Sequence, residues 1–142
     1  MRKVLQVTNN AIPTVAVGAN MPLGLVNVNC PRPCTEEVFN VTTSASDVVI
    51  INKSGYYRVN YNASLLAAAA GDLTLSLKLN GVVVNTLTVT TVAGATIAVA
   101  FTKYIYIPCN CQLNPNSVPA RLEITLGGVQ VTSGTSNTIV EG

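Results

Sequence analysis

One segment of the chain alternates between apolar and polar side chains: Gly55-Tyr56-Tyr57-Arg58-Val59-Asn60-Tyr61-Asn62-Ala63-Ser64-Leu65. From Tyr57 onward its odd positions are apolar or aromatic and its even positions are polar. Because successive side chains of a strand point to opposite faces, this pattern predicts a strand with one face buried. Residues 73–79 repeat the alternation and lead into Asn80-Gly81, a typical two-residue hairpin turn. Together the two patterns predict an all-β protein.

Short strand patterns continue on both sides of this segment, separated by turns rich in Gly, Pro and Asn. We expect about ten strands, at residues 23–28, 38–41, 48–51, 55–65, 73–79, 82–90, 96–107, 121–126, 129–132 and 138–140. Many short strands joined by such turns predict a sandwich or a barrel. Residues 1–20 resemble an extended N-terminal arm, and residues 21–142 are expected to form one β-domain.

The chain carries unusually few charges for a soluble domain. Only 10% of its 142 residues are Asp, Glu, Lys or Arg, while 49% are hydrophobic. A monomer of this composition would expose large, weakly polar areas, and such areas usually mark contacts with other chains. The composition therefore favours an obligate oligomer or a subunit of a larger assembly, with a monomeric sandwich covered by Thr, Ser and Asn as the alternative.

Several partner classes are not expected. The net charge of +2 and the lack of a basic run argue against nucleic acid. The longest weakly polar run, residues 92–100, is too short to span a membrane. Polar residues interrupt the N-terminal segment after Arg2 and Lys3, so it does not resemble a secretory signal, and we expect synthesis in a cytoplasm.

Catalysis is not expected either, and no cofactor is predicted. The chain has no histidine, so a Ser/His/Asp or Cys/His site cannot be built. Among the six acidic residues only Glu36 and Glu37 are adjacent, and neighbours on a strand point to opposite faces. The sequence therefore predicts a protein that is not an enzyme.

The four cysteines form two pairs, Cys30 with Cys34 and Cys109 with Cys111. Three arrangements remain open: disulfides between the two loops, four reduced thiols, or a four-thiolate zinc site. Synthesis in a cytoplasm disfavours disulfides, although a particle released into an oxidising medium could acquire them. A disulfide from Cys109 to Cys111 is disfavoured because their separation strains its geometry.

Residues 49–61, followed by residues 75–81, resemble the tumour-necrosis-factor and complement-C1q-like jelly rolls. In that family an apolar run leads into Gly-x-Tyr-x-Val-x-Tyr, and alternating apolar residues later lead into Asn-Gly. The similarity covers roughly residues 20–140 and is closest to the bacterial and bacteriophage branch. It implies an antiparallel jelly-roll sandwich of ten strands that works as a compact homotrimer. The chain lacks the family's collagen-like stalk, which favours a trimer seated on a larger surface.

These observations predict a structural virion protein: a homotrimeric decoration or cement protein on the outside of a bacteriophage capsid, assembled in the bacterial cytoplasm. Its partner would be the major capsid protein or another shell protein. We expect the contacts to come from the arm and from two tyrosines of the central strand: Arg2, Lys3, Val4, Leu5, Val7, Ile12, Tyr57 and Tyr61. The alternatives are a receptor- or glycan-binding fibre tip, for which the tyrosines would supply stacking rings, and a spore or cell-surface protein of the same fold.

Overall fold

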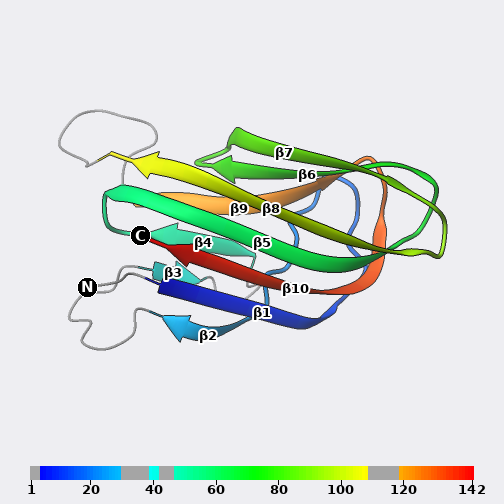
Figure 1. The fold of residues 1–142 in the computed structure, drawn as a ribbon, viewed down its shortest axis with the longest axis horizontal. Coiled ribbons are helices and arrows are strands. Elements are labelled where there is room, and N and C mark those ends of the chain that lie inside the picture. Colours follow the sequence, from blue (N-terminus) through cyan, green and yellow to red (C-terminus); the bar gives the residue numbers. More distant parts are fainter. Residues whose placement is uncertain (1–3, 30–38, 42–46, 109–118) are drawn as a thin grey trace.

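A computed structural model describes residues 4–29, 39–41, 47–108 and 119–142, which fold into two antiparallel sheets packed face to face (Figure 1). The ten strands are β1 (Val4–Ile12), β2 (Leu25–Asn29), β3 (Phe39–Val41), β4 (Val48–Ile51), β5 (Gly55–Ala67), β6 (Gly71–Leu79), β7 (Val82–Thr91), β8 (Thr96–Ile107), β9 (Ala120–Gly127) and β10 (Val131–Glu141). None of the described segments forms a helix, so none forms one able to cross a membrane. The predicted all-β sandwich is confirmed.

The first sheet has the strand order β2-β1-β10-β5-β8, with β10 at its centre. The segment that dominates the sequence pattern is β5, which pairs with β10 on one side and with β8 on the other. Its odd positions from Tyr57 to Ala67 are buried and its even positions are half-buried or exposed, as the alternation predicts. Chain ends meet in this sheet, since Val4 of β1 lies opposite Glu141 of β10.

The second sheet has the order β3-β4-β9-β6-β7. Its β6–β7 hairpin turns at Asn80 and Gly81, whose φ angles of 52° and 84° are the positive values that this turn requires. The Asn-Gly signal therefore predicted both the hairpin and its turn type correctly.

A single core lies between the sheets and is made of the inward-facing residues of both. The two largest buried side chains, Tyr57 and Tyr61, come from β5. The Tyr57 ring packs edge-to-face on Phe39 at 5.9 Å, and its hydroxyl donates a 2.6 Å hydrogen bond to the Lys53 carbonyl oxygen. These tyrosines thus hold the two sheets together from the inside.

The expected separate arm is wrong for the residues that the structure describes. Residues 4–12 are β1, which is paired with β10 on one side and β2 on the other. Leu5, Val7 and Ile12 are buried in the core. The segment that follows crosses to the second sheet, bridging through Val15 to Val131 and through Asn20 to Thr125. The N-terminal segment is therefore part of the sandwich.

The C-terminal region also differs from expectation, because two predicted short strands are one continuous strand, β10. Gly134 lies in the gap between the two predictions, and a Cβ at this position would overlap the Ser64 carbonyl oxygen of β5. This glycine allows two backbones to approach closely within the sheet.

Candidate interaction surface

The residues predicted to contact partners are mostly buried. Five of them have buried side chains: Leu5, Val7, Ile12, Tyr57 and Tyr61. Val4 is half-buried. Arg2 and Lys3 lie outside the described residues, as do Cys30, Cys34, Cys109 and Cys111, so the three cysteine arrangements stay open. A contact surface on the described part of the chain is therefore to be sought on the outer faces or the edges of the sheets.

The outer face of the first sheet, here named the neutral face, is nearly free of charge. It is made of the outward-facing residues of β1, β10, β5 and β8, which are mainly Thr, Ser, Asn, Ala and Tyr. Over the described residues its only charged side chains are Arg58 and Glu141, which lie opposite each other and form an ion pair. Little electrostatic solvation would be lost if another protein covered this face.

The outer face of the second sheet, here named the charged face, has the opposite character. Strands β6 and β9 place four charged side chains on it: Asp72, Lys78, Arg121 and Glu123. Lys78 lies directly opposite Glu123, and the Arg121 Nε atom is 3.6 Å from the Glu123 Oε2 atom. Charges interspersed in this way are typical of a surface that stays in water.

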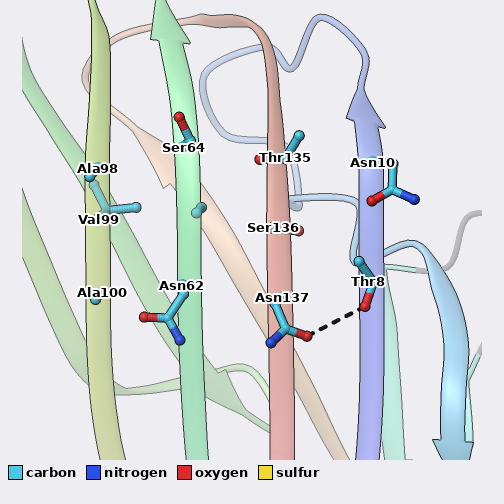
Figure 2. Close-up of a pocket in the computed structure, with 11 residues that line it drawn as sticks. Thr8, Asn10, Asn62, Ser64, Ala98, Val99, Ala100, Thr135, Ser136 and Asn137 are labelled. Carbon is cyan, nitrogen blue, oxygen red and sulfur yellow. Dashed lines mark hydrogen bonds between the residues drawn. The ribbon is translucent and has the colours of Figure 1, made fainter.

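A shallow depression of about 550 Å³ lies in the middle of the neutral face. Figure 2 shows that it runs across β8, β5, β10 and β1, with the small side chains of Ala98 and Ala100 on β8, Asn62 on β5 and Asn137 on β10. The Asn137 Oδ1 atom accepts hydrogen bonds from Gln6 Nε2 at 3.2 Å and Thr8 Oγ1 at 3.4 Å. These bonds fix the Asn137 amide, and none of the residues that line the depression is charged, so the depression is polar but uncharged.

Three tyrosines gather near one end of the neutral face. Tyr56, Tyr104 and Tyr106 are 77%, 70% and 55% exposed, and the rings of Tyr56 and Tyr106 are 4.8 Å apart. Tyr104 is opposite Arg58 on the neighbouring strand, which places the ion pair beside this tyrosine patch. The alternation of Tyr104 and Tyr106 with Ile105 and Ile107 indicates that the tyrosines face away from the core, and the register of β5 against β8 brings Tyr56 to them.

Hydroxyl groups also lie inside the sandwich beneath the neutral face. Among the described residues, the hydroxyls of Tyr61, Ser136 and Thr138 are buried without a hydrogen-bond partner of good geometry. Burial raises the pKa of Tyr61 to about 12, and the neighbouring Ser136 hydroxyl partly opposes this shift. Burial likewise raises the pKa of Tyr57 to about 12. The hydroxyl groups of Tyr57 and Tyr61 are therefore neutral at physiological pH, and both side chains pack in the core.

No metal or catalytic centre is evident in the part of the chain that the structure describes. There, no three His, Cys, Asp or Glu side chains lie close enough to hold a metal ion. Two carboxylates, those of Glu123 and Asp47, accept hydrogen bonds from the same amide group of Asn20. Its Nδ2 atom is 2.9 Å from Glu123 Oε2 and 3.4 Å from Asp47 Oδ2. This amide fixes the crossing segment to the second sheet and has a structural role.

Neither a protein-family model nor a curated protein sequence matches this chain. Solved structures do match over nearly its whole length. The fold is similar to murine APRIL, with a TM-score of 0.68, 10% identity, and coverage of 99% of this chain and 98% of the other. The globular domain of zebrafish complement 1qA gives a TM-score of 0.60 with 8% identity, covering 99% and 95%. This chain has the tumour-necrosis-factor/C1q-like jelly-roll fold.

A phage protein is also among the structures that share this jelly roll. The vertex protein P5 of PRD1 gives a TM-score of 0.60 with 14% identity, covering 98% of this chain and 95% of the other. At these identities the similarities establish the fold alone.

Proposed function

We propose that this protein is a structural virion protein that assembles as a homotrimer and decorates the outside of a bacteriophage capsid, without catalytic activity. The observation that carries the proposal is the neutral face, on which the described residues place a single ion pair. The resemblance to trimeric jelly rolls and the similarity to a phage vertex protein support the trimer and the virion. Assembly would take place in the bacterial cytoplasm, and the final location would be the capsid surface.

The neutral face is suited to be covered by other copies of the chain. A stable contact commonly buries about 800 Å² per partner, and a face made of four strands with almost no charge can supply such an area. Arg58 and Glu141 already neutralise each other, so covering them leaves no unpaired charge. The small side chains around the depression would let a neighbouring copy approach closely.

Because β1 is part of the sandwich, we propose that attachment to the shell uses the folded surface of the trimer. Three equivalent contacts per trimer would act together, and linked weak contacts can raise overall affinity by roughly 100- to 10,000-fold. The proposed shell partner is the major capsid protein or another protein of the same surface.

A charge placed on each face tests the trimer. Ala100→Glu puts a carboxylate at the depression of the neutral face, and Thr88→Glu puts one at an exposed position of the charged face. In native mass spectrometry we expect trimers for the wild type and Thr88→Glu, and monomers for Ala100→Glu. A monomeric wild type, or an Ala100→Glu variant that remains trimeric, would contradict the proposal.

The capsid role is tested separately by quantitative mass spectrometry of purified virions from the source that encodes the chain. We expect a copy number that is a multiple of three and scales with the capsid protein. Absence of the chain from intact virions, with the trimer confirmed, would place the protein on another surface such as a spore coat.

The tyrosine patch favours a second candidate function, a receptor- or glycan-binding tip. Exposed tyrosine rings can stack on sugars, and Arg58 and Glu141 lie beside them as hydrogen-bonding groups. A glycan array screened with the wild type and with Tyr104→Ala distinguishes the candidates. Wild-type binding that is lost in Tyr104→Ala would favour the tip, and no binding by the wild type would count against it.

A further inference from the structure

The Asn80-Gly81 turn carries chemistry as well as geometry. It is the one place in the sequence where an asparagine directly precedes a glycine. The backbone nitrogen of the following residue can attack the Cγ atom of an asparagine side chain, and glycine hinders this attack least because it has no side chain. The product is a five-membered succinimide ring, which water opens to aspartate or isoaspartate. The turn therefore has the residue pair most prone to spontaneous deamidation.

The attacking group is accessible in the folded chain. Gly81 is exposed, and apart from its chain neighbours no heavy atom of the described residues lies within 4 Å of the position that a Cβ would occupy. The turn joins β6 to β7, and Figure 1 shows it at the end of the sandwich toward which β6 and β10 both run. Water can therefore reach the Gly81 amide, whose proton has to be lost for its nitrogen to attack.

The group that would be attacked is held in place by β9. The Asn80 Oδ1 atom accepts a 2.8 Å hydrogen bond from the Arg121 backbone nitrogen, and the Asn80 backbone nitrogen donates a 2.8 Å bond to the Arg121 carbonyl oxygen. These two bonds extend the β6–β9 ladder by one residue beyond the pair of Leu79 with Leu122. The Asn80 backbone lies in the left-handed region, with a φ of 52°. Closing the ring requires rotation about the bonds of Asn80, so its pairing with β9 has to open first.

From this geometry we propose that Asn80 is a self-modification site controlled by opening of the β6–β7 hairpin. While the turn is closed, Arg121 holds the side-chain amide. When the turn opens, a bond forms between the Gly81 nitrogen and Cγ, the Cγ–Nδ2 bond breaks, and the Gly81 amide proton leaves with ammonia. Water then hydrolyses the ring, giving aspartate by cleavage at Cγ and isoaspartate by cleavage at the backbone carbonyl. The site lies within one chain and does not depend on the proposed function.

The two products would affect the hairpin differently. Aspartate leaves the backbone unchanged and tolerates the left-handed conformation, and its carboxylate can accept the same hydrogen bond from Arg121. Isoaspartate routes the chain through the side chain and lengthens the backbone by a methylene group, which a two-residue turn of fixed geometry cannot absorb. It would displace Leu79 from Val82 and loosen the start of β7. Isoaspartate at this position therefore records irreversibly that the hairpin has opened.

The test follows deamidation of the full chain at physiological temperature and mildly alkaline pH, beside a capped synthetic peptide of residues 76–85. Peptide mapping by mass spectrometry locates the modified asparagine, and electron-transfer fragmentation distinguishes isoaspartate from aspartate. We expect Asn80 to react in both samples, at least about 10-fold more slowly in the folded chain, because the reaction there waits for the hairpin to open. Equal rates would overturn the inference, as would an Asn80 that never reacts in the folded chain.

Three variants separate hairpin opening from other causes. Val83→Gly weakens β7 beside the turn at an exposed position and should speed the reaction, whereas Val92→Gly, at an exposed position just beyond the far end of β7, should not. Ala100→Glu, the variant expected to be monomeric, should keep the slow rate because the bonds to Arg121 lie within one chain. A Val83→Gly rate no faster than that of Val92→Gly, or an Ala100→Glu rate equal to that of the peptide, would contradict the inference. Native mass measures the trimer separately, so failure here leaves the proposed function standing.

Discussion

Leu5→Ala is the sharpest test of whether the N-terminal segment belongs to the core. Leu5 is fully buried in β1, with Val140 opposite it in β10. Truncating a buried leucine to alanine costs about 2–5 kcal/mol of the free energy of unfolding, through lost burial and the cavity left behind. For a chain of this size we expect a fall in Tm of roughly 5–20 °C. Thermal unfolding followed by circular dichroism at a fixed protein concentration measures it.

Asn10→Ala is the matched control, because Asn10 is an exposed residue of the same strand. Its free energy of unfolding should stay within about 0.5 kcal/mol of the wild type. If Leu5→Ala were as stable as Asn10→Ala while losing attachment to a larger surface, β1 would behave as a detachable arm. The placement of this strand in the sandwich would then be refuted.

Two further predictions concern a turn and the buried tyrosine. Gly128 has a φ of 78°, and a Cβ there would overlap the Asp72 carbonyl oxygen, so Gly128→Ala should lower the urea midpoint more than Gly94→Ala. Gly94 has a φ of 74° with open space around it, so its substitution carries only the backbone strain of about 1–2 kcal/mol; equal midpoints would contradict this reasoning. The pKa of Tyr61 rises from 10.0 to about 12 on folding, so its contribution to stability is complete below pH 10 and is lost as pH rises to about 12. Tyr61→Phe should therefore lose less stability than the wild type between neutral pH and that window in urea titrations, and identical losses would show that Tyr61 does not contribute.

The strands and their buried faces could be predicted from the sequence where local pattern determines them. The alternation in β5 and β6 gave the core-facing residues, and Asn80-Gly81 gave the hairpin, because both signals act over a few neighbouring residues. The limits expected for the strand at residues 96–107 agree with β8. These features needed no knowledge of distant partners.

The prediction failed where a distant partner decides the structure. The alternating residues of β1 suit an arm as well as an inner strand, and its main partner β10 lies at the other end of the chain. The two short strands expected at residues 129–132 and 138–140 are one strand, because the close approach of Gly134 to Ser64 cannot be seen in the sequence. The sequence predicts a low overall charge but does not show where the uncharged surface lies. The position of the neutral face depends on which strands the register brings together.

The pairing of Val4 with Glu141 has a practical consequence for engineering. Because β1 and β10 run side by side, a short linker could join Val4 to Glu141, and new chain ends could be opened at the exposed turn around Gly94. A cargo domain fused beside Val4 or beside Glu141 would leave the molecule at the same end, and Figure 1 shows the turn between β7 and β8 at the opposite end. The jelly roll could then serve as a display scaffold whose opposite end stays unobstructed.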